Sequence, residues 1–275
     1  MEGIYTMLKK FRNSSICVIM LILTSAVPVY SSVMATIALA AISWSTKKAL
    51  DYAWEYFVES DENVNTEEVI MRAEVKVQEG DPIAEYNLGL IYYSGYMVEQ
   101  NRYKAISLWK SSAEHGNIEA QCRLGYIYYY GDVERQNYET ALKYFIMAAE
   151  QGDPTGQYNA GVMYFNGTGI TQNKSEAVKF FKRAADNGEI SAQYILGEIY
   201  HEGDGAEYNP SEAFRYFMMS AENGDPDSQC NVGSMYYKGE GVERNEAKAL
   251  EWWSKAAYQG NEEAIYNIEL IHSDD

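Results

Sequence analysis

The chain has 275 residues, with 22 Lys and Arg against 40 Asp and Glu, which gives a formal net charge of −18. Apolar residues make up 47% and charged residues 23%, a balance that excludes wholesale disorder. The negative charge argues against a nucleic-acid partner, because phosphate binding needs a basic stripe. Three Cys are too few for a disulfide framework.

The first fifty residues have the opposite charge from the rest of the chain, with one acidic and five basic residues. Their basic start is followed by an apolar run from Ile16 to Tyr30, which predicts a signal peptide within residues 1–43. A second apolar stretch, 33–44, leaves open an uncleaved anchor, since the two together exceed the roughly 20 residues that span a bilayer. We expect a periplasmic protein, one anchored to the inner membrane and facing the periplasm, or a secreted one. Any membrane contact is expected through this segment alone.

Beyond residue 80, three series of glycines recur every 36 residues. The first series is Gly80, Gly116, Gly152, Gly188, Gly224 and Gly260. The second is Gly89, Gly125, Gly161, Gly197 and Gly233, and the third is Gly95, Gly131, Gly167, Gly203 and Gly239. Because they share one register without an insertion, they define five internal repeats over 81–260.

Each repeat has the pattern of two helices. In the first repeat, apolar residues at helical spacing predict a helix over 82–93 and a second over about 103–115. Gly89 lies in the middle of the first helix, at a cost of about 1 kcal/mol relative to Ala. The cost recurs in every repeat, so we expect a neighbouring helix to approach closely there.

A single pair of such helices cannot bury its apolar stripe, so the repeats must stack on one another. The predicted fold is all-α, a right-handed α-solenoid of tandem 36-residue helix-turn-helix repeats with capping helices at both ends. Residues 44–80 keep part of the repeat pattern, including Val69, Ala73 and Val77, and are interpreted as a degenerate N-terminal capping repeat. Residues 261–275 are interpreted as a C-terminal capping helix.

The segment from Ala192 to Gly205, AQYILGEIYHEGDG, is followed by Glu212-Ala213 and by AENG at 221–224. This pattern resembles the Sel-one-like repeat family, a relative of the tetratricopeptide repeats. The resemblance covers the chain from about residue 81 to its C-terminus. It implies an α-solenoid that acts as a protein-binding or adaptor module, and members of the family are commonly exported bacterial proteins.

The sequence offers little chemistry. It has no Gly-x-Ser-x-Gly or His-Glu-x-x-His motif, and no two of its histidines (His115, His201 and His272) share a helix at i, i+4. We expect no catalytic residues, no metal site and no cofactor, and a protein that is not an enzyme. One branch of the family carries a disulfide in each repeat. Here Cys122 and Cys230 are three repeats apart, beyond disulfide reach, and are interpreted as small buried residues.

The first helix of each repeat lines the concave side of an α-solenoid. Its positions that face away from the core are therefore candidate binding residues. The predicted partner-binding residues are Leu90, Tyr93, Tyr126, Tyr129, Tyr130, Val162, Phe165, Glu198, His201, Glu202, Ser234 and Tyr237. One of these phases is nearly all aromatic, as interface hot spots often are. The alternative is that this phase packs between adjacent repeats.

The predicted function is that of a non-enzymatic, exported solenoid, monomeric, that binds a protein partner with a basic surface on its concave face. A specific version, by analogy with exported members of the family, is an immunity protein that neutralises a secreted antibacterial toxin such as a type VI phospholipase. The alternative is a host-interacting virulence factor or envelope-assembly adaptor. A hydrolase, by analogy with the cysteine-rich branch and its claimed β-lactam binding, is a minor alternative.

Overall fold

The computed structural model describes residues 50, 52–53, 55–58, 65–96 and 98–273. The predicted signal peptide or anchor and the start of the N-terminal capping repeat lie outside these residues. All the regular elements of the described chain are α-helices, which confirms the predicted all-α class. In this part of the chain no helix combines the length and apolar character that a membrane span requires. The chain divides into two compact units, Met1–Ala120 and Gln121–Asp275.

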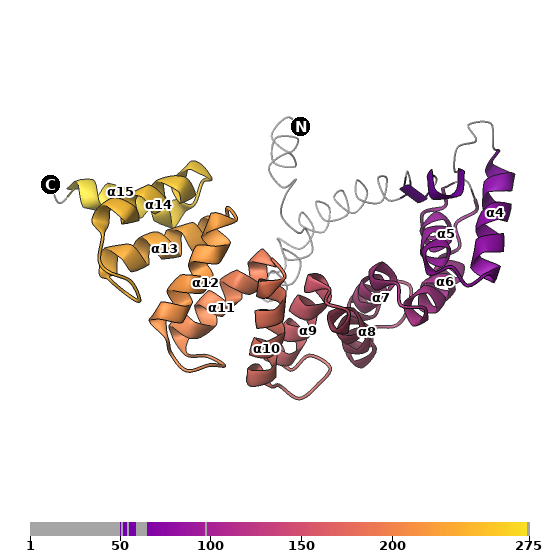
Figure 1. The fold of residues 1–275 in the computed structure, drawn as a ribbon, viewed down its shortest axis with the longest axis horizontal. Helices are drawn as coiled ribbons and strands as arrows, with labels where there is room; N and C mark the ends of the chain where they lie inside the picture. The colour runs from indigo at the N-terminus through magenta and orange to yellow at the C-terminus, as the bar shows by residue number, and fades with distance from the viewer. Residues whose placement is uncertain (1–49, 51, 54, 59–64, 97, 274–275) are drawn as a thin grey trace. The chain divides into compact units, whose positions relative to one another are not determined.

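The helices alternate between a first (helix A) and a second (helix B) member of each repeat (Figure 1). In the first unit, α4 (Thr66–Gln78) and α6 (Arg102–Glu114) are B helices, and α5 (Pro82–Ser94) is an A helix. The A helix α7 (Ile118–Tyr130) contains the boundary between the units. The second unit continues with α8 (Tyr138–Glu150), α9 (Pro154–Asn166), α10 (Lys174–Asp186), α11 (Ile190–Glu202), α12 (Pro210–Glu222), α13 (Pro226–Lys238), α14 (Glu246–Tyr258) and α15 (Glu262–Ser273).

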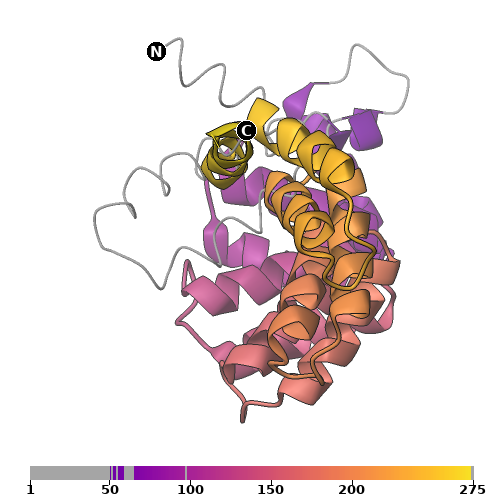
Figure 2. The same cartoon turned by 90° about the vertical axis from the view of Figure 1, so that its left-hand side faces the viewer.

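Each helix from α5 to α14 has 13 residues, so the repeat is nearly constant in its local structure. Neighbouring helices along the chain pack on one another, as Figures 1 and 2 show for the hairpins formed by α11 to α14. This confirms the predicted α-solenoid of tandem helix pairs. In the first repeat the observed bounds differ by one residue from the predicted ones at the end of α5 and at both ends of α6.

Asparagine begins every B helix of the five repeats. The side chain of Asn173, for example, accepts a hydrogen bond from the backbone N–H of Glu176 at 3.1 Å, which satisfies one of the unpaired donors of the first turn. The equivalent caps are Asn101, Asn137, Asn209 and Asn245. Helix A begins with Asp-Pro in three repeats and ends at a glycine with a positive φ, such as Gly203 at 76°.

The mid-helix glycines mark a close approach of helix B to helix A, as predicted. A Cβ atom on Gly197 would lie 2.5 Å from the Cδ1 of Phe217, which is far inside van der Waals contact. The corresponding glycine of repeat five, Gly233, faces Trp253 in the same way. The missing side chain lets a large ring lie across the backbone of helix A, and this ring forms the centre of the core in each repeat. Phe217 and Trp253 are 2% and 3% exposed.

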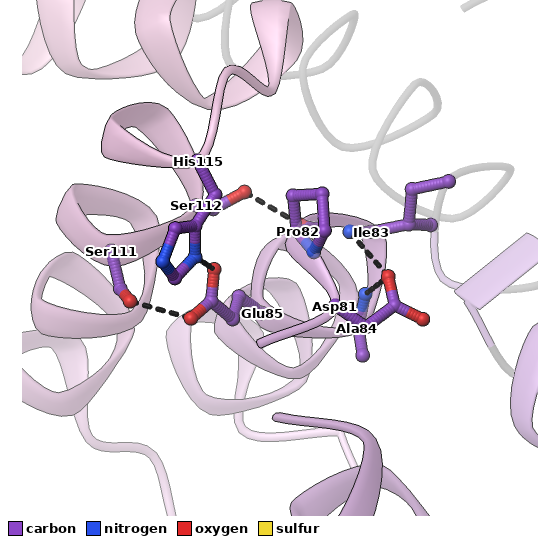
Figure 3. Close-up of polar contacts among 8 residues, drawn as sticks. All are labelled: Asp81, Pro82, Ile83, Ala84, Glu85, Ser111, Ser112 and His115. Atoms are coloured by element: carbon purple, nitrogen blue, oxygen red, sulfur yellow. Dashed lines mark hydrogen bonds and ion pairs between the residues drawn. The ribbon is translucent and has the colours of Figure 1, made fainter. Parts of the chain in front are cut away.

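A polar pair joins the start of helix A to the end of helix B in each repeat. In repeats two to five it is a pair of amides, such as Gln151 Nε2 donating to Gln121 Oε1 at 2.8 Å. The other pairs are Asn187 with Gln157, Asn223 with Gln193 and Gln259 with Gln229. In repeat one the same positions hold Glu85 and His115, whose Oε2 and Nδ1 atoms are 2.9 Å apart (Figure 3). Glu85 is buried, and its other oxygen accepts from the hydroxyl of Ser111 at 2.5 Å.

The two ends of the repeat array are covered by additional helices. In the first unit, Val69 and Ala73 of α4 are fully buried in a cluster with Phe57 and with Leu88 of α5. At the other end, α15 packs on α14 and buries Ala264. These contacts place apolar side chains of both flanking segments against the terminal repeats.

The two described cysteines differ from each other. Cys230 is buried, as predicted, and burial raises the pKa of its thiol to about 12. Cys122 is partly exposed, contrary to the prediction, and its Sγ donates to the Oδ1 of Asp153 at 3.2 Å. Its position at the edge of α7 leaves it beside the cap of the next helix A rather than inside the core.

Candidate functional site

The predicted binding residues fall in both units. Leu90 and Tyr93 belong to α5 in the first unit, and the others belong to α7, α9, α11 and α13 in the second unit. Leu90 is 2% exposed, so its side chain offers no surface to a partner, and its predicted place on a binding face is wrong. The equivalent residues Tyr126, Val162, Glu198 and Ser234 are partly exposed. We call the partly exposed positions of α7, α9, α11 and α13 the helix A face.

The aromatic phase of helix A packs against the core ring of its own repeat. The centroid of Tyr237 lies 5.6 Å from that of Trp253, and the other side of the ring is covered by the guanidinium of Arg244 at 5.6 Å. Phe165 lies in the same way between Phe181, at 6.2 Å, and the ammonium of Lys174, at 5.0 Å. In the first unit, Tyr93 is sandwiched between Trp109 at 5.1 Å and Arg102 at 4.9 Å. The faces of these rings are therefore occupied within the repeat, and their edges remain partly exposed.

Repeat two gathers several tyrosines at the end of α7. We define the tyrosine cluster as Tyr126, Tyr129, Tyr130 and Tyr138. Within it the centroid of Tyr129 lies 5.0 Å from that of Tyr130 and 5.2 Å from that of Tyr138, in edge-to-face geometry. Tyr126 and Tyr130 stack at 6.4 Å. Tyr130 is 40% exposed, so the cluster presents an amphipathic surface to solvent.

Tyr138 was not predicted as a site residue, because it is the first residue of a B helix. It is equivalent to Arg102 and Lys174, the cations that cover the aromatic phase in repeats one and three. A comparison of this phase across the repeats was the available signal. The tyrosine at 138 replaces a cation by a ring, and this substitution makes repeat two more aromatic than its neighbours.

A pocket of about 210 Å³ opens on the helix A face between α11 and α13, and α15 closes one side of it. We call it the α11–α13 pocket. Its lining residues are Glu198, His201, Phe217, Asn231, Ser234, Met235, Lys238, Glu240 and Glu263. The predicted residues Glu198, His201 and Ser234 thus meet in one place, whereas Glu202 lies outside the lining and is exposed.

Several polar contacts order the wall of this pocket. The Nε2 of His201 lies 3.2 Å from the Oε1 of Glu240, which also accepts from the hydroxyl of Tyr208 at 3.1 Å. The Nδ2 of Asn231 lies 3.5 Å from the Oε1 of Glu198. The sequence analysis missed Glu240 and Glu263 because they come from a loop and from the next repeat, outside the helix A phases.

The acidic residues of this region raise one another's pKa. Burial raises the pKa of Glu198, and the negative charge of Glu202 acts in the same direction. Burial also raises the pKa of Asp227 at the start of α13, with further contributions from Asp225 and Glu263. Both effects arise because a half-buried carboxylate is poorly solvated and has negative neighbours. The C-terminal part of the helix A face is therefore strongly acidic.

The described residues give no indication of a metal centre, since they contain no group of three or more His, Cys, Asp or Glu side chains that could hold an ion. The two cysteines and three acids around the pocket are too dispersed for such a role. What the helix A face offers is aromatic surface in repeat two and carboxylates around a cavity in repeats four and five. Both are means of non-covalent recognition.

Known proteins were compared with the whole chain. A model of the Sel1 repeat matches five consecutive segments, 82–117, 118–153, 154–189, 190–225 and 226–261. A protective antigen of uropathogenic Escherichia coli strains that displays an SLR fold is 30% identical, with a TM-score of 0.72 over 85% of this chain. The match covers 50% of that protein, so the present chain spans half its length. A Sel1 repeat protein from Oxalobacter formigenes is 28% identical, with a TM-score of 0.63, over 80% of this chain and 84% of the other.

An immunity protein from Pseudomonas aeruginosa also has this type of fold, at 17% identity and a TM-score of 0.41 over 80% of this chain and 84% of its own. That likeness is too distant to carry an argument about function. No curated protein sequence matches the chain. The five matched segments together cover more than half of the chain and coincide, within one residue, with the internal repeats and the observed helix pairs. The chain therefore belongs to the Sel1 repeat family.

Proposed function

We propose that this protein binds a protein partner through the helix A face of its second unit, and that the partner presents basic side chains to the acidic end of this face. Sel1 repeat proteins mediate protein–protein interactions. The observation that carries the proposal is the occurrence of two recognition features on the A helices of one unit, the tyrosine cluster and the α11–α13 pocket.

The tyrosine cluster supports the proposal by its chemistry. Tyrosines combine a large apolar ring with a hydroxyl group, lose little side-chain entropy on binding, and are enriched among the residues that dominate interface energetics. In the cluster, edge-to-face contacts hold Tyr129 between Tyr130 and Tyr138, so the rings are ordered before a partner arrives. Preordered side chains reduce the entropic cost of association.

Charge supports the basic character of the partner. The chain carries a net charge of −18, and the pocket end of the helix A face adds Glu198, Glu202, Glu240 and Glu263. Complementary charge accelerates encounter and is screened by salt. We therefore expect the association rate constant to fall by roughly tenfold or more between 20 and 300 mM salt. Stopped-flow measurements at several salt concentrations check this, and a salt-independent rate would contradict a basic partner.

Export of the protein is part of the same proposal. The basic start and apolar run of residues 1–43 support a signal peptide or a membrane anchor. The partner would then be met in the periplasm, at the inner membrane or outside the cell. A toxin as partner would make the protein an immunity factor, whereas an envelope component or a host protein would make it an assembly adaptor or a virulence factor.

Capture from an envelope extract tests the proposal, with the full chain tagged at its C-terminus as bait. We expect one stoichiometric partner that is retained by the wild type and lost from the Tyr129→Ala/Tyr130→Ala variant. The matched control is Tyr258→Ala on α14, a tyrosine that is 91% exposed and lies off the helix A face. Urea unfolding of all three proteins verifies that they are folded. A partner that binds the double variant and the control equally well would refute the proposed binding face.

A further inference from the structure

Two junctions between A helices of the second unit are built alike but differ at one residue. At the α7–α9 junction, the Nδ2 of Asn159 donates to the hydroxyl of Tyr126 at 2.8 Å. At the α11–α13 junction, two repeats further on, the equivalent residues are Asn231 and Glu198. Here the amide reaches the carboxylate only at 3.5 Å, the limit of a hydrogen bond. The repeat thus provides an internal comparison of the same position with and without an aromatic ring.

The ring at the α7–α9 junction shows what the other junction can accommodate. The centroid of Tyr126 lies 5.1 Å from that of Phe145, the core ring of its repeat, in edge-to-face geometry. The equivalent core ring at the α11–α13 junction is Phe217, and it lines the α11–α13 pocket. Glu198 is shorter than tyrosine and has no ring, so a planar group can enter beside Phe217 from outside. The position filled by the chain itself at one junction is open at the other.

The groups around this open position select a cation. Three carboxylates line the pocket, those of Glu198, Glu240 and Glu263, against one ammonium group, that of Lys238. His201 supplies a second planar ring, 6.5 Å from Phe217, and its Nε2 is already directed to Glu240. Half-buried carboxylates that lack a matching cation are stabilised when a positive group enters and bonds to them.

We propose that the α11–α13 pocket is an anchor site for an arginine side chain of the partner. A guanidinium is planar, so it can lie beside Phe217 where Tyr126 lies beside Phe145, and its N–H groups can donate to Glu198 and Glu240. A lysine ammonium is compact and strongly hydrated, and it lacks the plane that fits beside the ring. The site deepens the proposed function, on which its biological use rests, by naming the residue that the acidic end of the helix A face recognises.

Binding of a short peptide to the full-length protein tests the site without knowledge of the partner. The probe is Ac-Gly-Arg-Gly-NH2, and the reference peptides replace Arg by citrulline, which has a similar shape but no charge, or by Lys. The signal of the His201 imidazole in a ¹H–¹³C NMR spectrum reports occupancy of the pocket. We expect a saturable shift with the Arg peptide and binding at least tenfold weaker with the citrulline and Lys peptides.

Two variants assign the effect to the pocket. Glu198→Gln should weaken binding of the Arg peptide at least tenfold. Glu198→Tyr restores the residue that fills the α7–α9 junction and should abolish binding. Glu251→Gln, on α14 outside the pocket, changes the net charge by the same amount as Glu198→Gln and should leave binding unchanged. Unfolding curves are recorded for each variant, and the tyrosine occupies the equivalent position in repeat two without disrupting its fold.

Three outcomes would overturn the anchor site. These are equal binding of the Arg and citrulline peptides, equal effects of Glu198→Gln and Glu251→Gln, and a His201 signal that does not move. The result is separable from that for the proposed function. Peptide binding with no captured protein would refute only the proposed function. A partner captured through the tyrosine cluster with no response to Glu198→Tyr would refute only the arginine site.

Discussion

Gly197 illustrates how a single residue determines the packing of a repeat. A helix interior ordinarily favours Ala over Gly by about 1 kcal/mol. The ring of Phe217 crosses the backbone of α11 at this point, however, and leaves no space for a Cβ atom. Overpacking of a close-packed core costs about 1–3 kcal/mol, so the steric term outweighs the propensity term.

We therefore predict that Gly197→Ala lowers the free energy of unfolding by about 1–3 kcal/mol, although alanine is the better helix former. Urea unfolding followed by circular dichroism measures the change. In a Phe217→Leu background the same substitution should cost less, because the smaller side chain vacates the site. An increase in stability in the wild-type background would show that helix A and helix B do not approach closely here.

Glu189 is a residue whose charge opposes folding. Its side chain is 7% exposed at the start of α11, and burial raises its pKa above the ordinary value near 4.5, with Asp153 acting in the same direction. A carboxyl group whose pKa is raised in the folded state is favoured while protonated. Its contribution to stability is fully present below about pH 4.5 and is lost as the pH rises through the folded-state pKa.

From this sign we predict that Glu189→Gln is more stable than the wild type at pH 7, because the variant buries no charge. The difference should shrink as the pH is lowered towards 4.5. Thermal or urea unfolding of both proteins between pH 4 and pH 8 measures it. A stability difference that is constant over this range would mean that Glu189 does not titrate differently in the folded and unfolded states.

At the scale of the element, the polar pair between helix A and helix B holds the two ends of each hairpin together. Repeats two and five use two glutamines, and repeat one uses Glu85 and His115 (Figure 3). Both types satisfy a polar side chain at the base of the hairpin. The pair is interchangeable in principle, since what a buried acceptor requires is a donor rather than a particular residue.

We predict that Glu85→Gln/His115→Gln keeps the free energy of unfolding within about 1 kcal/mol of the wild type, because it installs the glutamine pair of repeats two and five. Glu85→Ala should instead cost about 1–3 kcal/mol, since the hydroxyl of Ser111 and the imidazole of His115 lose a buried acceptor. Urea unfolding of the two variants compares them. Equal losses would indicate that the Glu85–His115 pair is specifically required.

At the scale of the whole molecule, the constant period makes the repeat the unit of folding. Each interior repeat contributes an A helix and a B helix of 13 residues, with the same cap and the same glycine slot. The stability of such an array is approximately a sum of repeat and interface terms. Removal of one whole period therefore leaves the pattern of contacts continuous.

We predict that deletion of residues 154–189, one full repeat, gives a folded helical protein of reduced stability. Deletion of residues 172–189 removes half as many residues but takes away α10, which leaves the apolar face of α9 without its partner. This control should lose more helix per residue and unfold less cooperatively. Circular dichroism and urea unfolding test the pair, and an unfolded 154–189 deletion would contradict the modular description.

The fold could be predicted in detail because its information is local and repeated. Five aligned glycines at positions such as 89 and 197 indicated a close helix approach, and aligned asparagines and prolines mark the helix starts. The binding face was less accessible. The phase of Leu90 on helix A suggested exposure, but the side chain is 2% exposed, since periodicity gives a direction on a helix and not what covers it.

The amino-acid sequence by itself determined the family, the all-α repeat architecture and the register of every helix pair, because a strict 36-residue period repeats each local signal five times. Only the tertiary structure decided how the outward side chains combine. It placed the aromatic phase against the core rings, joined Tyr138 to the tyrosines of α7, and brought Glu240 and Glu263 to Glu198. Those groups come from different repeats and from loops, and their proximity depends on packing distances that no linear pattern contains.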